Sequence, residues 1–392
     1  MKRLIGVILA CFAVLTLSAA PKDIIIGLSI PVTGSQAAGG QQALYGAQLA
    51  VEEMNKAGGI KLSDGYHKVK IIYEDDKGDT TLCDTTVRRL VSNGAVAILG
   101  PYFSGQTIAL DSTMRELKVP LVNSATSIKI PELKNPWLWR CRCDDGINVL
   151  ILGKAIMNDY KAKHGSLNGL KVGILCCNDE TGTSAAASYK QYFDRNNVKY
   201  YADSHNKDET DLTAYVQKAM AAGCNAWVSS THDIAAAALA KAMHELGLRN
   251  QIIYMNPILA QTDVLKLMQP EWVEGWGCVS DYSFSDTRPV PAAFTKAWLA
   301  KYGKNPIPDV QGALYYGHAT VVMDAIRRAD SFDPSKIRDA IAKTHGLQVV
   351  VGKAYADKYT NLIYEISIAK IHNLVPEIVG SVSMASDYGF ED

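Results

Sequence analysis

Short apolar runs and longer amphipathic segments alternate along the first third of the chain. Residues 24–30 form a continuous apolar run of strand length, whereas residues 42–57 place apolar side chains at helical spacing and stop at Gly58-Gly59. The same order predicts further strands at 69–73, 96–99 and 121–123, and helices at 82–92 and from the 96–99 strand through residue 117. This βαβαβ order predicts a parallel sheet covered by helices on both faces.

A second series of the same kind begins after Asp144-Asp145-Gly146. It predicts helices at 147–163, 185–196, 211–222 and 233–247, and strands at 172–175, 200–202, 226–230 and 252–254. From about residue 279 three helices follow, at 292–302, 312–329 and 334–343, with a last strand near 362–371. We therefore expect an α/β protein with two Rossmann-like lobes and a site between the carboxyl ends of their strands.

The N-terminus has the pattern of a secretory signal. Lys2-Arg3 precedes an apolar run at 4–17 and the small residues Ser18-Ala19-Ala20, so we expect a signal peptide at 1–20 and a periplasmic protein. Lys22-Asp23 ends the run before the roughly 20 apolar residues of a transmembrane helix. Basic and acidic residues number 40 each, which indicates neither a nucleic-acid nor a membrane-surface partner.

Cysteine spacing and the catalytic motifs that were sought argue against a metal site and against an enzyme. Of the eight cysteines, Cys11 lies in the signal, so an odd number remains and at least one thiol has no internal partner. The alternation in W-L-W-R-C-R-C at 137–143 predicts a strand with the sulfurs of Cys141 and Cys143 on one face. No C-x-x-C pair or zinc-finger histidine spacing occurs, so we expect no metal and no cofactor. Residues 100–107 are one residue from a P-loop, but Gln106 stands where the phosphate lysine is needed. We expect no enzyme.

The candidate chemistry lies at two strand ends. The run V-A-I-L-G-P-Y-F-S-G-Q-T at 96–107 brings Ser104 to the end of one strand, and the strand at 121–123 is followed by Ser124-Ala125-Thr126. Hydroxyls and free backbone N–H groups at neighbouring strand ends favour binding of an anion, here a small carboxylate. The aromatic residues Tyr102, Phe103 and Tyr282 either line the cleft or pack in the core.

Several segments resemble the type I periplasmic binding proteins, in the leucine/isoleucine/valine-binding branch that serves ABC transporters. The resemblance rests on residues 26–34, 46–55, 58–60, 75–76, 100–105 and 120–126. It implies two lobes joined by a three-segment hinge. Lobe 1 would comprise residues 21–144 plus 280–356, and lobe 2 residues 145–279 plus 357–392.

The resemblance also implies a function. We expect a monomeric exported protein that captures a small carboxylated ligand, an amino acid of the branched-chain type, and delivers it to an ABC permease. Two alternatives stay open, because one fold serves many ligands. The protein could be a ligand sensor without transport, or it could bind an amide, urea or an aromatic acid that lacks an α-amine.

By the same resemblance, Ser104, Ser124, Ala125 and Thr126 hold the ligand carboxylate. In the second half the family's residues are replaced: a tyrosine falls near Thr181, an aromatic at His232, and the acid that pairs with the ligand ammonium near the neutral Asn256. The aromatic of the first loop falls at Gly39 or Gly40. Ammonium recognition would then require an acid elsewhere, and the candidates are Asp179, Glu180 and Asp281.

Overall fold

The computed structural model describes residues 22–34, 36–363, 365–385 and 390. The predicted signal peptide, 1–20, lies outside these residues. None of the helices in the described part of the chain combines the length and the apolar character needed to cross a bilayer.

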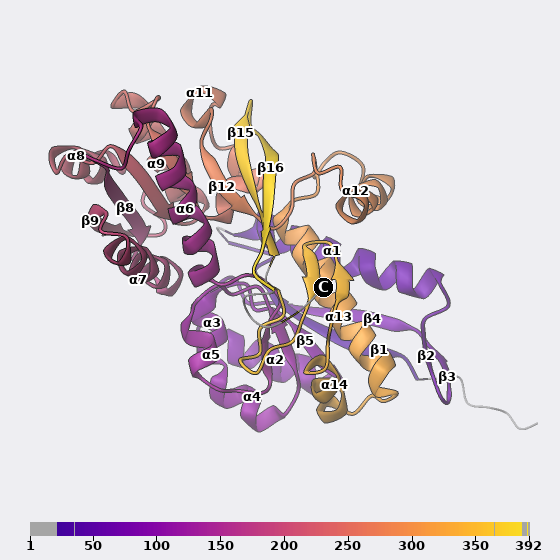
Figure 1. Cartoon of the computed structure of the whole chain (residues 1–392). Coiled ribbons are helices and arrows are strands. Elements are labelled where there is room, and N and C mark those ends of the chain that lie inside the picture. The colour runs from indigo at the N-terminus through magenta and orange to yellow at the C-terminus, as the bar shows by residue number, and fades with distance from the viewer. Residues whose placement is uncertain (1–21, 35, 364, 386–389, 391–392) are drawn as a thin grey trace, which may run out of the picture.

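The first sheet has five strands, all parallel, in the order β4-β1-β5-β6-β7. They are β1 (Ile24–Ile30), β4 (Val69–Asp75), β5 (Ala97–Leu99), β6 (Leu121–Asn123) and β7 (Leu138–Arg140). One face packs on α1 (Ala37–Lys56) and α13 (Val310–Ala329), and the other on α2 (Cys83–Ser92) and α4 (Asp111–Leu117), which α3 (Ser104–Ala109) contacts. We call this sheet with its helices lobe 1 (Figure 1).

Alternation within β1 explains why the sheet is covered on both faces. Ile26 and Leu28 belong to the core under α1 and α13, whereas Ile25 packs into the cluster under α2. Gly27 also faces α2, where a Cβ would lie 2.7 Å from the Cδ1 atom of Ile98. The position therefore has no room for a side chain.

The second sheet has seven strands in the order β16-β15-β12-β11-β10-β8-β9. The parallel strands are β8 (Lys171–Cys177), β9 (Lys199–His205), β10 (Ala226–Ser230), β11 (Ile252–Met255) and β12 (Gly277–Ser280). β15 (Glu365–His372) and β16 (Val375–Ser383) complete the sheet as antiparallel strands. Helices α6 (Asp145–His164) and α7 (Glu180–Arg195) pack together, as do α8 (Thr213–Ala221) and α9 (Asp233–Glu245). We call this half lobe 2.

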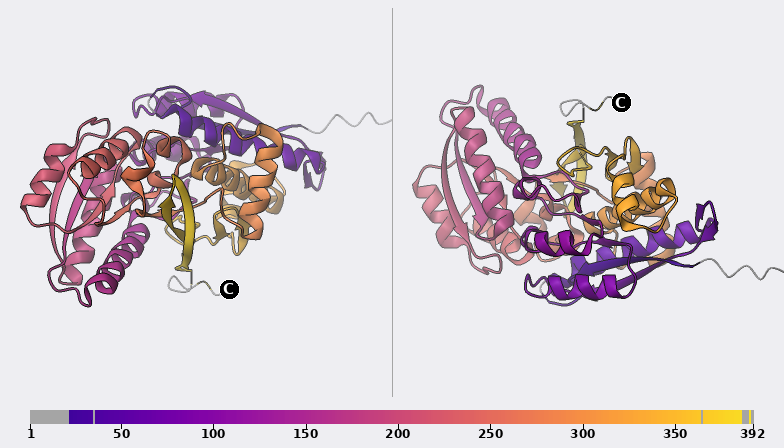
Figure 2. Two further views of the ribbon diagram at one scale, coloured as in Figure 1. Left: turned by 90° about the horizontal axis from the view of Figure 1, so that it is seen from above. Right: turned by 90° about the horizontal axis from the view of Figure 1, so that it is seen from below.

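The chain passes between the two sheets three times. The crossings join β7 to α6, β12 to α12 (Pro289–Tyr302), and β14 (Gly352–Ala354) to β15. After the second crossing the chain returns to lobe 1, where α13 packs along α1 and α14 (Pro334–Ile341) packs on α13. Two views in Figure 2 show the two halves side by side with β15 and β16 between them. Two parallel sheets with three crossings confirm the predicted fold class.

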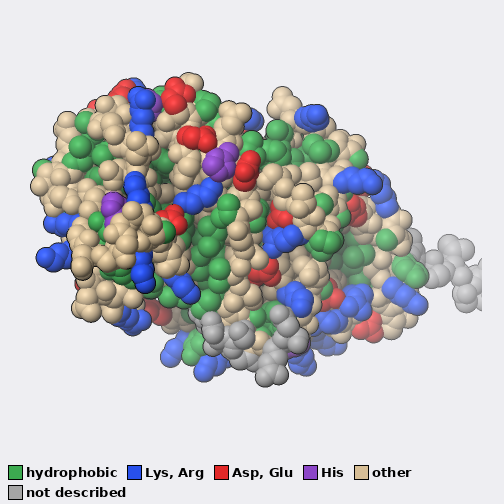
Figure 3. Space-filling view, turned by 45° about the horizontal axis from the view of Figure 1, so that its top comes forward, with side chains coloured by type: hydrophobic (Ala, Val, Ile, Leu, Met, Phe, Trp, Pro, Cys, Tyr) green, Lys and Arg blue, Asp and Glu red, His purple; other side chains and the backbone are tan. Residues whose placement is uncertain are grey.

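Short elements make up the rest of the described chain. They are the hairpin β2 (Ile60–Leu62) and β3 (Gly65–His67), α5 (Lys129–Glu132), the 3-10 helix η1 (Pro257–Ala260), α10 (Thr262–Leu265), α11 (Pro270–Val273), and β13 (Leu347–Val349) paired with β14. Basic and acidic side chains are interspersed on the face drawn in Figure 3, in keeping with the equal numbers of the two kinds.

Two local expectations were wrong. The helix expected through residue 117 is two helices, α3 and α4, that meet at Leu110. The alternation around Cys141 and Cys143 predicted a strand carrying both sulfurs, but β7 ends at Arg140 and both cysteines lie in the first crossing. The seven cysteines of the described chain are all free thiols, six of them buried.

Candidate ligand-binding cleft

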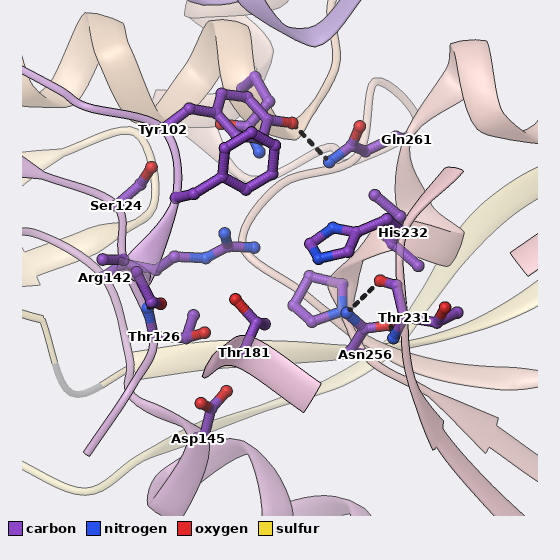
Figure 4. Close-up of a pocket in the computed structure, with 16 residues that line it drawn as sticks. Tyr102, Ser124, Thr126, Arg142, Asp145, Thr181, Thr231, His232, Asn256 and Gln261 are labelled. Carbon is purple, nitrogen blue, oxygen red and sulfur yellow. Dashed lines mark hydrogen bonds between the residues drawn. The ribbon is translucent and has the colours of Figure 1, made fainter. Parts of the chain in front are cut away.

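A cavity lies where the carboxyl ends of both parallel sheets meet, as Figure 4 shows. Residues of both lobes line it, and the empty space within it and at its open mouth amounts to about 480 Å³. All nine residues proposed from the sequence line it: Tyr102, Phe103, Ser104, Ser124, Ala125, Thr126, Thr181, His232 and Asn256. The structure brings them together, and their contacts with a ligand stay predictions.

The lobe 1 rim, which we define as Ser104, Ser124, Ala125 and Thr126, follows β5 and β6. The Ser104 hydroxyl oxygen accepts hydrogen bonds from the backbone N–H groups of Thr126 and Ser127, each 3.2 Å long. The Ala125 N–H donates to the Asn123 side chain at 2.9 Å. Ser104 therefore fixes one strand end to the next and holds the hydroxyl-bearing segment at the cavity wall.

Tyr102 lies against Gly39, one of the two positions at which the resemblance puts the family's first-loop aromatic. A Cβ at Gly39 would lie 2.6 Å from the Tyr102 hydroxyl, so the glycine leaves room for this ring. The hydroxyl accepts a hydrogen bond from Gln261 of lobe 2, 3.5 Å long, and the ring packs against Phe103. Burial, with the nearby Asp233 charge, raises the pKa of Tyr102 well above its usual value.

The third aromatic residue considered from the sequence does not line the cavity. Tyr282 is fully buried in the core, and its hydroxyl lies 2.6 Å from that of Thr295. The packing alternative was correct for this residue, because its ring meets Phe294 on α12 rather than the strand ends.

Arg142 is a cavity residue that the sequence reasoning missed. It lies in the first crossing, and its side chain extends toward the cavity centre in Figure 4. Nε donates a hydrogen bond to Asp281 Oδ2 at 2.9 Å, Nη2 lies 2.7 Å from the same oxygen, and both side chains are buried. Nη1 donates no hydrogen bond within the described residues, which leaves one face of a buried cation for an anion. The signal was the pair of arginines, Arg140 and Arg142, in the tryptophan- and cysteine-bearing segment 137–143.

Asp145 is the second residue that was missed. Asp144 caps α6 by accepting the Ile147 N–H at 2.9 Å, and it pairs with Arg140. Asp145 follows it, donates its own N–H to the Thr126 carbonyl at 2.8 Å, and lines the cavity. Within the described residues its Oδ2 has no hydrogen-bond partner. Burial raises the pKa of its carboxyl to about 7, against hydrogen bonds from Thr126 and Ser184 that lower it.

The lobe 2 rim, defined as Thr181, His232 and Asn256, is largely occupied with its own contacts. The Asn256 amide donates to the Thr231 carbonyl at 3.1 Å and accepts the Thr231 N–H at 3.3 Å. His232 Nε2 lies 2.7 Å from Asp179 Oδ2. Burial favours neutral Asp179, but the hydrogen bonds from His232, Cys177 and the Gly182 N–H together lower its pKa well below the usual range.

The three acids considered as ammonium partners do not line the cavity. Asp281 pairs with Arg142, Asp179 with His232, and Glu180 with Lys129. Asp145 is the acid that does reach it.

The two lobes touch beside the rims, so the cleft is closed in this structure. Glu180 of lobe 2 accepts hydrogen bonds from the Ser127 hydroxyl at 2.8 Å and from Lys129 at 2.9 Å. The Ile128 N–H donates to the Ser184 hydroxyl at 3.2 Å, and the Phe103 ring meets the His232 ring edge-on with centroids 5.4 Å apart. A ligand in the cavity would be enclosed on both sides.

A family model described as periplasmic binding protein matches residues 23–372, and the chain belongs to this family. Within it, the chain is 27% identical over 346 residues to an amino acid binding protein of Pseudomonas aeruginosa, covering 87% of each chain. It is 26% identical to Leu/Ile/Val-binding protein homolog 2 of Brucella abortus, covering 84% of this chain and 85% of that one. The family resemblance seen in the sequence is confirmed.

Solved structures confirm the fold. The leucine-binding protein of Thermotoga maritima superposes with a TM-score of 0.80 at 20% identity, over 93% of this chain and 99% of that one. The branched-chain amino acid binding protein LivJ of Streptococcus pneumoniae, solved with isoleucine, gives 0.79 at 24% identity, over 92% and 99%. A solute-binding protein of Rhodopseudomonas palustris in complex with 4-hydroxybenzoate gives 0.80 at 19% identity, over 93% and 97%.

Proposed function

We propose that this chain is an exported solute-binding protein that takes up a small carboxylated ligand, an amino acid of the branched-chain type, and passes it to the permease of an ABC transporter. The observation that carries this proposal is the pair of charged groups in one closed cavity. Arg142 has an unused guanidinium nitrogen there, and Asp145 has a carboxylate oxygen without a partner in the described chain.

This pair suggests how an amino acid would lie. Its carboxylate would meet Arg142 and the hydroxyls of Ser104, Ser124 and Thr126, because charge-assisted hydrogen bonds are the stronger kind. Its ammonium would meet Asp145, which compensates the charge taken from water. Pro257 and Ile258, with Phe103, line the same cavity and would contact an apolar side chain.

An acid without an amine is the second candidate. It is favoured by Asn256, which stands near the family's acid position but has both ends of its amide bonded to Thr231. The raised pKa of Asp145 also allows the neutral carboxyl to donate a hydrogen bond to a ligand without an ammonium.

Competition between leucine and its deaminated analogue, 4-methylpentanoate, separates the two candidates. A thermal-shift screen of amino acids, amides, urea and aromatic acids on extensively dialysed protein first identifies binders, because a tight ligand raises Tm. Leucine should then win in calorimetry by more than about 100-fold, roughly 2.7 kcal/mol. If the analogue binds more tightly, the proposed ligand becomes an acid without an amine. If the protein binds neither amino acids nor such acids, the proposal is overturned.

Delivery to a permease requires that the cleft open and close. We propose lobe limits of 21–144 plus 280–356 and 145–279 plus 357–392, with ligand favouring closure about the three crossings by a hinge, a mode the family is known for. Small-angle scattering should show a smaller radius of gyration with ligand than without it. An unchanged radius at saturation would contradict the hinge. Candidate ligands should be recovered chemically unchanged, because the proposed role is not enzymatic.

Transport and sensing use the same cleft and differ in the partner. Permease and ATPase genes beside this one would support transport, whereas a neighbouring histidine kinase gene would support sensing. The periplasmic location rests on the predicted signal peptide, and N-terminal sequencing of the exported protein tests cleavage near residue 20.

A further inference from the structure

Side chains with metal-binding chemistry gather at the strand ends of lobe 2, beside the cavity. The Cys177 sulfur, an Asp179 carboxylate oxygen and a His232 ring nitrogen all lie within 4.8 Å of one another. We propose that these three residues, with His205 as the fourth ligand, bind one transition-metal ion of the zinc type. The proposal does not depend on which molecule the cleft binds.

The distances already approach those of a coordination sphere. Cys177 Sγ lies 3.0 Å from Asp179 Oδ1, and His232 Nε2 lies 2.7 Å from Asp179 Oδ2. Metal bonds of about 2.0–2.3 Å in a tetrahedron separate the ligand atoms by roughly 3.3–3.8 Å. The three groups would therefore adjust by an ångström or so to admit an ion.

His205 supplies an independent observation that points to a ligand. Its Nδ1 lies 2.9 Å from the Asn206 carbonyl oxygen. Because a carbonyl only accepts, Nδ1 carries the hydrogen, and the neutral ring has its lone pair at Nε2. The ring is buried, and Nε2 has no partner among the described residues. A histidine held through Nδ1–H by a carbonyl is the usual arrangement for metal binding through Nε2.

Sheet register brings His205 to the cluster. Cys177 and His205 are directly paired across β8 and β9, so their side chains emerge on the same face of the sheet. His232 follows β10, the neighbour of β8 on its other side. The ligand atoms that already lie within 4.8 Å of one another belong to Cys177, Asp179 and His232 and do not include those of His205. The His205 ring would have to turn toward Cys177, and give up its present contact with the Asn206 carbonyl, to complete the set.

The donor types fit zinc and its neighbours in the first transition series. One sulfur, one carboxylate oxygen and two imidazole nitrogens form a tetrahedral set that suits Zn²⁺ or Co²⁺, whereas Mg²⁺ and Ca²⁺ require oxygen ligands. As the metal bonds form, the thiol proton leaves to water, and the hydrogen that His232 Nε2 gives to Asp179 moves to Nδ1, so that Nε2 is free to bind the metal. A thiolate, a carboxylate and a divalent cation then sum to zero charge, as a buried site requires.

The sequence gives no metal motif because the ligands come from three separate strand ends. Cys177, His205 and His232 are about a strand and helix apart along the chain, and only the parallel sheet makes them neighbours. Gly182 keeps space for the sulfur, since a Cβ there would lie 2.5 Å from Cys177 Sγ.

Cobalt titration of the metal-stripped protein tests the site. Co²⁺ should bind one ion per chain with thiolate-to-cobalt charge-transfer absorption and strong visible bands of tetrahedral geometry, and Zn²⁺ should displace it. Cys177→Ser should abolish the charge-transfer band. Cys176→Ser, the adjacent buried thiol on the opposite face, should leave it unchanged. His205→Gln and His232→Gln should each weaken Co²⁺ binding at least about tenfold, with His164→Gln, an exposed histidine on α6, as the control.

Unfolding midpoints of every variant in a chelator show whether each one folds. If Cys177→Ser does not fold, Asp179→Asn, which keeps the thiol, should still weaken Co²⁺ binding with its charge-transfer band present. Absence of that band from the unsubstituted protein, or equal Co²⁺ affinity in both cysteine variants, would overturn the proposal. If only His205→Gln binds as tightly as the unsubstituted protein, the fourth ligand is wrong and the proposed four-residue site fails.

Discussion

The two rims of the cleft come from equivalent strand ends of similar lobes, yet they use their polar groups differently. On the lobe 1 rim, the Thr126 hydroxyl bonds to Asp145, but the Ser104 hydroxyl, which accepts two N–H groups, donates its own hydrogen to none of the described residues. On the lobe 2 rim, Asn256 is bonded to Thr231 and His232 to Asp179. A polar group that is already paired gains little from a ligand. We therefore expect the lobe 1 rim to supply affinity for the carboxylate and the lobe 2 rim mainly to enclose the ligand.

The two charged side chains proposed to bind the ligand belong to neither rim but to the first crossing between the lobes. Arg142 and Asp145 both lie between β7 and the first turn of α6, the segment about which we propose the hinge. A ligand held by both residues would contact the hinge and both rims at once. Binding and closure would then be coupled directly, because only the closed form satisfies all three.

The largest effect is expected from Arg142→Met. It would leave the Asp281 carboxylate buried without its partner, and breaking a buried pair costs about 3–5 kcal/mol of unfolding free energy. Carboxylate affinity should fall at least about 30-fold, since truncating one partner of a buried charge pair costs 2–5 kcal/mol. Urea unfolding and calorimetry measure the two losses separately.

The double variant Arg142→Met/Asp281→Asn is the matched control. It removes the unpaired charge, so it should recover much of the stability while binding remains weak. Recovery of binding together with stability would show that Arg142 supports the fold without contacting the ligand.

The parts that the sequence predicted share a physical cause, and so do the parts it missed. Ser104 begins α3 after the short loop that follows β5, and Thr126 lies in the loop just after β6, so strand position alone brings them to the sheet edge where a ligand binds. Arg142 and Asp145 lie beyond a strand end, in a crossing whose path depends on how the lobes pack. The pairing of Asn256 with Thr231 also depends on the tertiary structure, so the periodicity of the sequence cannot predict it. Hydrophobic pattern therefore gave both sheets and the lobe 1 rim, but not the charged centre.

Removing one hydroxyl from each rim, at Ser104 and at Thr181, compares what the two rims contribute to ligand affinity. Ser104→Ala should weaken carboxylate binding roughly 10- to 100-fold, because a hydrogen bond to a charged group contributes about 1.5–3 kcal/mol. Thr181→Ala should weaken it less than about threefold, since the lobe 2 rim mainly encloses the ligand. Ser104→Asp should abolish binding through repulsion between two carboxylates. Normal affinity in the aspartate variant would remove Ser104 from the site, and equal losses in both alanine variants would end the distinction between the rims.

A pH series tests the role of Asp145. Its raised pKa of about 7 keeps the carboxyl largely neutral below pH 7, and an ammonium binds the ionised form. Leucine should therefore bind roughly tenfold more tightly at pH 8 than at pH 6, as the competent fraction rises. Asp145→Asn should remove most of this pH dependence, which separates Asp145 from the histidine in the same cavity. For 4-methylpentanoate the sign should reverse, because its carboxylate meets an increasingly charged Asp145. Leucine affinity that falls with pH would contradict the assignment.

The smallest effect is expected from an ion pair between the two lobes. Lys129 of lobe 1 pairs with Glu180 of lobe 2 at 2.9 Å, and the lysine side chain is 57% exposed. An exposed ion pair contributes about 0.2–1 kcal/mol, so Lys129→Ala should weaken ligand binding by no more than about fivefold, through a less stable closed form. Added salt should diminish the difference, because it screens exposed charges. Lys154→Ala, which removes an exposed lysine on α6, is the matched control, and this variant should bind the ligand normally.

Since the Lys129–Glu180 pair forms on closure, the loss of affinity should appear mainly as faster ligand dissociation in stopped-flow measurements. Slower ligand association with unchanged dissociation would show that Lys129 attracts the ligand and does not stabilise the closed form.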